Sequence, residues 1–380
     1  MTPLARLAGS PFWPMLRKEF IQMRRDRLTL ALMVGVPAIQ LLLFGFAIQT
    51  EVRNLPTLVY DESRSSESRA LIAALENTHN FRLLPDTVLS RAALERAIVA
   101  GRARAAVVIP PDYARDLKRG RGATAQVIVD ASDPLASSGA IGGAQQAGMA
   151  RAQALLPATA TGGRASPPVR VLVRPWFNPM LRSAVYIVPG IIGVLLSMTL
   201  IIIMSVAVVR ERERGTLEQL IVTPISRTGL MLGKIVPFIL VGYVQVSVIL
   251  LLGRLVFDVP LRGSLPLLYL AALPFIFASL SIGLLISTLV RTQAQAMQLG
   301  FLFLLPNILL SGFMFPREAM PAPAQWLGAA LPLTWFLEIL RGILLRAAGA
   351  WAIWPQALVL TGFAVVFATL AVLRFHKSMD

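Results

Sequence analysis

The chain has 380 residues, of which 56% are hydrophobic and 15% charged, with a formal net charge of +16. Soluble domains are about 45–50% apolar and about 25% charged, so this composition predicts a membrane protein. Cysteine is absent, and the only two histidines, His79 and His376, lie far apart in the sequence. This excludes disulfides and thiol chemistry and argues against a metal site. We attribute the positive charge to topology and contact with anionic lipid rather than to nucleic-acid binding.

The first apolar segment covers residues 28–49 and contains no charged residue. Because about 20 apolar residues cross the hydrocarbon core, it predicts a first transmembrane helix within residues 28–50. A cleaved signal peptide is the alternative. It fits poorly, because a long basic stretch precedes the segment and Ala47-Ile48-Gln49 lacks the small-residue cleavage pattern. Residues 1–27 are basic and amphipathic, which is typical of a helix at the membrane surface.

Residues 51–183 are too rich in charge for a lipid environment. Short strand-like runs alternate with helix-like runs, which predicts a small α/β domain. A linker is expected at 157–168, where Gly, Pro, Ser and Thr accumulate. The expected strands are 57–60, 81–84, 105–109, 126–129 and 169–173, and the expected helices are 66–76, 91–100, 112–118 and 135–156.

Residues 184–380 contain five further apolar runs long enough to span a membrane. Residues 316–354 lie between the last two runs and contain charged residues, short apolar stretches and tryptophans. This predicts amphipathic or re-entrant helices at the outer membrane surface, anchored by the tryptophans. The predicted fold is therefore an all-α six-helix transmembrane bundle with an inserted extracytoplasmic α/β domain. The five runs are 185–209, 235–256, 265–289, 294–315 and 355–373; the charged residues are Arg317, Glu318, Glu338, Arg341 and Arg346; the tryptophans are Trp326, Trp335, Trp351 and Trp354.

The distribution of basic residues predicts the orientation. If the N-terminus is cytoplasmic, the short cytoplasmic segments hold many more Lys and Arg residues than the short outer segments. Six spans then place both termini in the cytoplasm and residues 51–183 outside the cell membrane.

No catalytic or nucleotide-binding motif is found. Gly229 to Lys234 is the closest approach to a P-loop, but it has three residues between its glycines instead of four. Ile235 also stands where the Mg²⁺-binding Ser or Thr belongs. The predicted spans contain no Asp or Glu, which argues against an ion-coupled carrier. We therefore expect a non-enzymatic chain that binds no cofactor.

The most informative segment is the predicted cytoplasmic loop 210–234. Gly215 interrupts the charged helical extension before it. Thr216 and Gln219 then form a capping box for a short helix that ends before Pro224. Leu217, Leu220 and Ile221 give this helix an apolar side. A simple surface turn is one interpretation; the other is a docking helix that inserts into a cytosolic partner.

This loop resembles that of the ABC-2 type transport permeases, in which the pattern E-x-E-x-G-T-x-E-x-L-x-x-x-P precedes a Gly-Lys pair. The matching residues here are Glu211, Glu213, Gly215, Thr216, Glu218, Leu220 and Pro224, with Gly233-Lys234. Further matches are Pro189-Gly190, the segment Gly312 to Pro316, and Arg341-Gly342. The large domain after the first helix resembles the multidrug-efflux branch of these bacterial permeases.

The resemblance implies a complex of two permease copies, identical or homologous, with two cytosolic ATPase subunits that use ATP and Mg²⁺. It makes 216–224 the coupling helix and the N-terminal segment an elbow helix near the ATPase. It also implies the bacterial inner membrane as the location and a periplasmic adaptor as a further partner. The implied coupling residues are Glu211, Glu213, Gly215, Thr216, Glu218, Gln219, Leu220 and Pro224, and the basic elbow residues are Arg17, Lys18, Arg24, Arg25 and Arg27.

Polar side chains within the spans are candidates for a substrate route through a largely apolar pathway, which suits amphiphilic or drug-like cargo. The same residue types also hold membrane helices together. The candidates are Gln40, Tyr243, Gln245, Gln298 and Asn307. Two other functions stay open: a membrane-anchored scaffold or sensor whose outer domain binds a ligand, and an ion-coupled secondary transporter.

Overall fold

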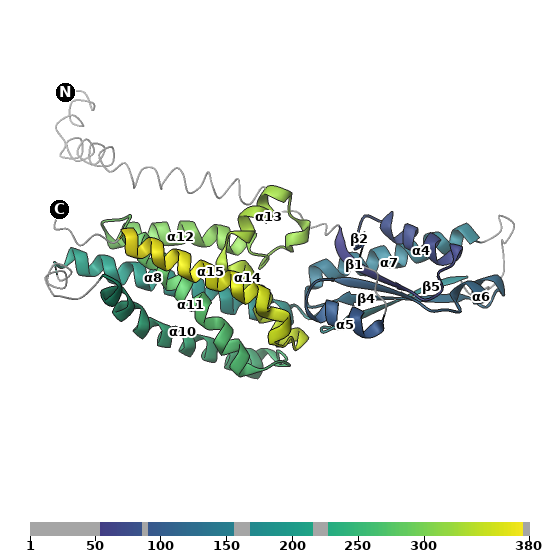
Figure 1. Ribbon diagram of the computed structural model, residues 1–380, viewed down its shortest axis with the longest axis horizontal. Helices are drawn as coiled ribbons and strands as arrows, with labels where there is room; N and C mark the ends of the chain where they lie inside the picture. The colour runs from purple at the N-terminus through teal and green to yellow at the C-terminus, as the bar shows by residue number, and fades with distance from the viewer. Residues whose placement is uncertain (1–53, 86–89, 156–167, 216–226, 375–380) are drawn as a thin grey trace, which may run out of the picture.

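The computed structural model describes residues 54–85, 90–155, 168–215 and 227–374. It shows an elongated molecule with a helical bundle at one end and an α/β domain at the other (Figure 1). The predicted first span (28–50), the elbow segment (1–27) and the predicted coupling helix (216–224) lie outside the described residues.

The α/β domain is built on one five-stranded sheet with the order β2-β1-β3-β4-β5. Neighbouring strands are parallel except β3 and β4, which are antiparallel. The central strand β3 has the sequence AAVVI and is buried throughout, as expected of a strand covered on both faces. The strands are β1 (Leu55–Asp61), β2 (Phe81–Leu83), β3 (Ala105–Ile109), β4 (Ala123–Asp130) and β5 (Val169–Trp176).

Helices cover both faces of this sheet (Figure 1). Helices α4 (Ser66–Glu76) and α7 (Pro134–Leu155) pack on one face, and α5 (Arg91–Val99) packs on the other. Helix α6 (Tyr113–Lys118) joins the α4 side. The predicted α/β fold is confirmed. Strand β5 runs past the predicted end at 173 through Pro175, because an edge strand tolerates proline.

The strand directions explain how the domain is inserted. Strands β1 and β3 start at the edge of the domain that faces the bundle and run away from it. Strands β4 and β5 run in the opposite direction and finish at that same edge. The chain therefore enters the domain before Leu55 and leaves it after Trp176 on the same side (Figure 1). Residues that open β3 or close β4 are thereby placed against the bundle.

Five helices of the described residues are long and apolar enough to cross a membrane. Helices α13 (Ala322–Ala329) and α14 (Pro332–Arg346) meet at an angle of 83°. If this bent pair is counted as one broken span, the number of candidate membrane spans among the described residues rises to six. Helices α13 and α14 follow the short helix η1 (Arg317–Ala319) and lie toward the α/β domain (Figure 1). The predicted membrane helix bundle is confirmed. Its five long helices are α8 (Ser183–Glu213), α10 (Arg227–Phe257), α11 (Leu265–Ser287), α12 (Gln293–Leu310) and α15 (Ala350–Arg374).

Helix α11 is the most enclosed of the five and packs against α8, α14 and α15. Small residues allow these helices to approach closely, as is usual in membranes. Gly283 of α11 faces the backbone of α8, where an added Cβ would lie 2.6 Å from the Ile201 carbonyl oxygen. By contrast, a Cβ atom added to Gly362 of α15 would meet nothing within 4 Å.

Gly283→Ala is therefore expected to destabilise the bundle by about 1–3 kcal/mol, because backbone atoms must move to admit the methyl group. Gly362→Ala is the matched control and is expected to be neutral or stabilising by up to about 1 kcal/mol, since alanine is the better helix former. Thermal unfolding of both variants in mild detergent checks this. Equal melting temperatures for the two would contradict the packing described.

Candidate functional site

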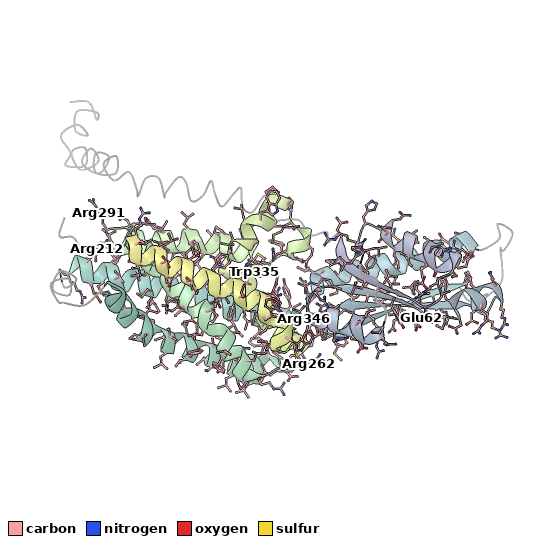
Figure 2. The ribbon with its side chains drawn as sticks, viewed as in Figure 1. Glu62, Arg212, Arg262, Arg291, Trp335 and Arg346 are labelled. Carbon is pink, nitrogen blue, oxygen red and sulfur yellow. The ribbon has the colours of Figure 1, made fainter. Side chains whose placement is uncertain are left out.

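Basic residues lie at both ends of the bundle (Figure 2). Arg212 and Arg291 lie at the end remote from the α/β domain, whereas Arg262 and Arg346 lie beside that domain. Helix α8 has 31 residues, which at about 1.5 Å per residue is about 46 Å, longer than the roughly 30 Å hydrocarbon core. The end of α8 and the start of α10, which flank residues 216–226, are both at the remote end (Figure 1).

Charged residues tie three helices together at the remote end. Glu211 of α8 forms an ion pair with Lys234 of α10. The carboxylate of Glu213 accepts hydrogen bonds from the Gln293 backbone N–H at 2.9 Å and its side-chain amide at 2.5 Å. Because Gln293 begins α12, the negative charge of Glu213 sits where the helix dipole favours it.

Three of the eight predicted coupling residues, Glu211, Glu213 and Gly215, are thus placed at this end. Gly215 has φ +71, a backbone conformation that favours glycine, and it follows Arg214, the residue that caps the end of α8. A displacement of the segment after Gly215 would act on α8 directly and on α10 and α12 through the two carboxylates. The other predicted coupling residues, Thr216, Glu218, Gln219, Leu220 and Pro224, lie outside the described residues, as do the elbow residues and Gln40.

The structure does not bring the substrate-route candidates together. Tyr243 and Gln245 lie on α10 and Gln298 and Asn307 on α12, and these two helices occupy opposite sides of the bundle (Figure 1). Tyr243 and Gln245 bond to neighbouring helices, Asn307 bonds within its own helix, and Gln298 is exposed. The Tyr243 hydroxyl donates to the Tyr269 carbonyl at 3.2 Å, the Gln245 side-chain oxygen accepts from Thr199 at 2.9 Å, and the Asn307 amide donates to the Phe303 carbonyl at 3.1 Å.

An apolar cavity of about 680 Å³ opens between α10, α11 and α15. Its walls include Phe277 of α11 and Ile353 and Trp354 of α15. The lining side chains are apolar except for the Thr361 hydroxyl and the indole N–H of Trp354. A site of this size and composition suits the apolar part of a drug-sized ligand.

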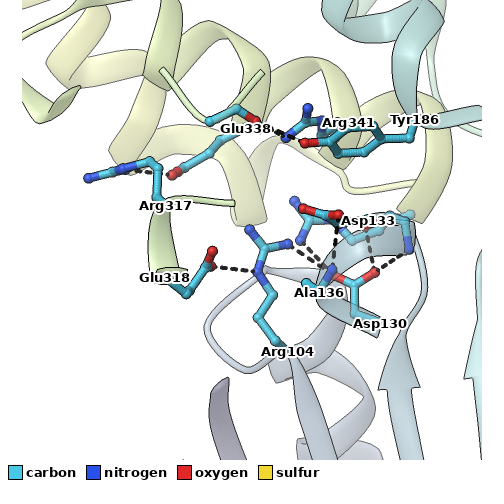
Figure 3. A network of polar contacts seen from close by, with 12 residues as sticks. Arg104, Asp130, Asp133, Ala136, Tyr186, Arg317, Glu318, Glu338 and Arg341 are labelled. Carbon is cyan, nitrogen blue, oxygen red and sulfur yellow. Dashed lines mark hydrogen bonds and ion pairs between the residues drawn. The ribbon is translucent and has the colours of Figure 1, made fainter. Parts of the chain in front are cut away.

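A network of charged residues joins the α/β domain to the bundle (Figure 3). We call it the junction network. Its members come from the start of β3, the end of β4 and the loop after it, η1, and α14. They comprise four arginines and four acids: Arg104, Asp130, Asp133, Arg317, Glu318, Glu338, Arg341 and Arg346.

Asp130 is the centre of the junction network. One of its carboxylate oxygens lies 3.1 Å from Arg104 and 3.5 Å from Arg346 of α14. The other accepts hydrogen bonds from the Ser132 backbone N–H at 3.1 Å and its hydroxyl at 2.6 Å. Asp130 is 3% and Arg346 7% exposed. The carboxylate therefore links the domain and the bundle from a buried position.

Other contacts extend the junction network outward. Arg104 also reaches Glu318 at 3.2 Å, and Arg317 pairs with Glu338 at 3.1 Å. The Arg341 guanidinium lies over the Tyr186 ring at 4.1 Å. The Gly312 carbonyl accepts from both Arg341, at 3.0 Å, and the Tyr186 hydroxyl, at 3.2 Å.

The electrostatics of the network follow from burial and pairing. Burial alone raises the pKa of Asp130, but Arg346, Arg104 and the Ser132 hydrogen bonds outweigh it and hold the pKa below its ordinary value. Glu318 behaves alike, because Arg104 outweighs the burial that raises its pKa. At Asp133 the effect of burial is larger than the attraction of Arg341, so the pKa of this carboxyl is raised. Asp130 and Glu318 are thus ionised partners of the arginines.

Sequence reasoning missed the domain half of this network. Arg104 directly precedes a strand and Asp130 ends the next one. Because β3 and β4 are antiparallel neighbours, the start of one lies beside the end of the other, so the charge pattern at the strand ends was a usable signal. Among the tryptophans, Trp326, Trp351 and Trp354 are exposed as expected of surface anchors. Trp335 is partly buried and donates to the Ala329 carbonyl at 2.8 Å.

Comparison with known proteins places this architecture in a family. The model of the ABC-2 family transporter protein matches residues 27–373. Among curated proteins of Escherichia coli K12, the probable multidrug ABC transporter permease YbhS is 32% identical over 369 residues, covering 96% of both chains. The probable multidrug ABC transporter permease YbhR is 32% identical over 343 residues, covering 90% of this chain and 92% of YbhR. The inner membrane transport permease YhhJ is 34% identical over 306 residues, covering 78% of this chain and 79% of YhhJ.

No solved structure matches the chain. The family match covers nearly the whole sequence, and the relatives align over the α/β domain as well as the bundle. Permeases of this family do not themselves hydrolyse ATP, which agrees with the prediction of a non-enzymatic chain. This multi-pass membrane protein belongs to the ABC-2 family of transporter permeases.

Proposed function

We propose that the chain is the membrane subunit of an exporter for amphiphilic or drug-like molecules, driven by separate ATPase subunits that bind at the remote end. The observation that carries the proposal is the construction of that end. The family's loop pattern begins in the last turn of α8 and continues toward α10, and its Glu211 and Glu213 contact α10 and α12. A displacement of the loop by a bound partner would be transmitted through these contacts to α8, α10 and α12.

The proposed topology follows from the same arrangement. The loop between α8 and α10 must face the cytoplasm to meet an ATPase. Arg212 and Arg291 lie at that end (Figure 2), and the short segments predicted there hold more Lys and Arg than the short segments at the other end. The α/β domain lies at the opposite end of the bundle and is therefore assigned to the outer side of the inner membrane. Both chain termini are assigned to the cytoplasm, and the bent pair α13–α14 to the outer face.

The proposed partners are two ATPase subunits, which supply ATP and Mg²⁺ chemistry, and a second permease copy, identical or homologous. An adaptor protein on the outer side is a further proposed partner of the α/β domain. The cargo class is supported by the relatives named as probable multidrug permeases. The apolar cavity between α10, α11 and α15 is also suited to the apolar part of such a molecule.

Reconstituted transport tests the proposal. The chain is purified in mild detergent with the ATPase that accompanies it and reconstituted into liposomes, and movement of an amphiphilic fluorescent dye is followed. We expect transport only with ATP and Mg²⁺ present, and no dependence on a proton or sodium gradient. Gradient-driven, ATP-independent transport would instead indicate a secondary transporter. The failure of any ATPase to associate, with no transport, would indicate a ligand-binding scaffold or sensor.

A further inference from the structure

A small polar cavity lies where the α/β domain meets the bundle. Its volume is about 190 Å³, enough for several water molecules, since one occupies about 30 Å³ in the liquid. The segment after α12 contributes Ser311 and Gly312, η1 contributes Arg317, α14 contributes Arg341, and the α/β domain contributes Arg104 and Asp133. We call it the junction cavity.

Arg341 is the unusual member of the lining. The other three arginines of the junction network each lie within 3.5 Å of a carboxylate oxygen. Arg341 has no carboxylate within 4.0 Å among the described residues, although it is only 9% exposed. Its Nη1 donates to the Gly312 carbonyl and its guanidinium lies over the Tyr186 ring, but its Nε and Nη2 are buried without a hydrogen-bond partner in that part of the chain. A buried charge is normally paired, because leaving it unpaired is costly.

The acids that line the junction cavity are already engaged elsewhere. Glu318 is bound by Arg104, and the two oxygens of Glu338 are bound by Arg317 and Gln356. Asp133 accepts hydrogen bonds from the backbone N–H groups of Leu135 and Ala136 at 3.0 and 3.2 Å, at the start of α7. Its raised pKa, caused mainly by burial, makes it a weak counterion for Arg341.

Another residue of the lining also carries an unpartnered donor. Ser311 lines the junction cavity, is 2% exposed, and its hydroxyl has no hydrogen-bond partner in the described residues. A guanidinium edge with two nitrogens that lack a hydrogen-bond partner, together with a hydroxyl from the same lining, is a donor set that matches the oxygens of an anionic group. Waters alone would satisfy the hydroxyl, but they would leave only the Tyr186 ring and the more distant carboxyl of Asp133 to offset the charge of Arg341.

We propose that the junction cavity is an oxyanion site, in which Arg341 and Ser311 bind the carboxylate, sulfonate or phosphate group of a small molecule. Its position beside the α/β domain assigns it to the outer end of the transport path. The site would therefore hold the acidic group of an amphiphilic cargo close to its exit. That assignment to cargo rests on the proposed export function, whereas the binding of an anion does not.

Isothermal titration of the full chain in phosphatidylcholine nanodiscs tests the site without ATP or ATPase. The probes are benzoate and its neutral counterpart benzamide. We expect benzoate to bind at least about tenfold more tightly than benzamide, because the guanidinium favours the charged group. Ser311→Ala and Arg341→Lys should each weaken benzoate binding by about tenfold or more while leaving benzamide unchanged.

Two variants protect the test from a simple folding defect. Ser311→Ala removes a hydroxyl that makes no described bond, so the fold should be unaffected even if Arg341→Lys proves unstable. Ser281→Ala is the matched control, since Ser281 of α11 is also buried with an unpartnered hydroxyl but is not part of the junction cavity. We expect it to bind benzoate as the unmodified chain does.

Two further arms identify the source of the anion. Binding of inorganic phosphate, weakened by the same two substitutions, supports a free anion as ligand. Weaker benzoate binding in nanodiscs that also contain phosphatidylglycerol supports occupation by a lipid head group. Equal binding of benzoate and benzamide, or a benzoate preference that survives in both variants, would overturn the proposal. A lack of ATP-driven transport would count against the export function and leave the binding result standing.

Discussion

Asp130→Asn is expected to lower the free energy of unfolding by about 3 kcal/mol, the scale on which a buried ion pair is lost when one partner is removed. The substitution keeps the shape of the side chain but removes its charge. Arg346, 7% exposed, then has no carboxylate in the described structure, and Arg104 retains only Glu318. Because these contacts join the α/β domain to α14, the domain should also separate more readily from the bundle.

Thermal unfolding and limited proteolysis in mild detergent measure both effects. Glu95→Gln is the control, because Glu95 forms an exposed ion pair with Arg91 on the same domain, and such pairs contribute only about 0–1 kcal/mol. We expect a clear loss of stability and faster cleavage between domain and bundle for Asp130→Asn alone. Similar, small effects in both variants would show that the junction network does not hold the two parts together.

The same comparison has a defined pH dependence. The pKa of Asp130 is lowered in the folded chain, since Arg346, Arg104 and Ser132 outweigh burial. A carboxyl with a depressed folded pKa contributes its stability above the unfolded value of about 3.9 and loses it as pH falls through the folded value. The difference in stability between the unmodified chain and Asp130→Asn should thus be constant above about pH 4 and shrink below it.

Gly215→Pro and Thr216→Trp are expected to reduce ATP-driven export by at least about tenfold without preventing membrane insertion. Gly215 has φ +71, whereas proline fixes φ near −65°, so the chain direction after α8 must change. Thr216→Trp removes the predicted cap and adds bulk where the ATPase is proposed to bind. ATP hydrolysis by the partner should continue, because its own site is untouched, so transport and hydrolysis become uncoupled.

Gly233→Ala is the control for this pair. It lies in α10 beside Lys234, and an added Cβ meets nothing within 4 Å, so export should be retained. Parallel measurement of dye transport and phosphate release in liposomes gives the coupling ratio. Undiminished export in both the Gly215 and Thr216 variants would leave the loop as a surface turn and remove the proposed docking role.

Much of the fold could be predicted, because the hydrophobic pattern and the Gly, Pro and capping residues that end helices and strands determine it. Helix α4 and strand β3 have the predicted bounds, and the five long helices of residues 184–380 were each expected from apolar length alone. The pattern was less informative at the ends of elements. Helix α10 begins at Arg227 rather than at 235, because a transmembrane helix continues into water as long as its backbone bonds are satisfied.

The junction network could not be predicted in full, because it depends on contacts between residues far apart in the sequence. Arg104 and Glu318 are in contact across more than half of the chain. The sequence marks residues 316–354 as unusual for their charge, but the partner surface that explains those charges belongs to another domain. The substrate route could not be predicted for a related reason: glutamines and tyrosines of membrane helices serve packing and transport alike.

Site-specific labelling of single cysteines tests the central claim most directly, because the chain contains no native cysteine. Lys118→Cys places an exposed thiol on the α/β domain, and Arg291→Cys places one at the remote end. Spheroplasts expressing each variant are treated with a membrane-impermeant maleimide before and after lysis. We predict that Lys118→Cys is labelled in intact spheroplasts and Arg291→Cys only after lysis. The reverse pattern would put the loop between α8 and α10 on the side without ATP and contradict the account.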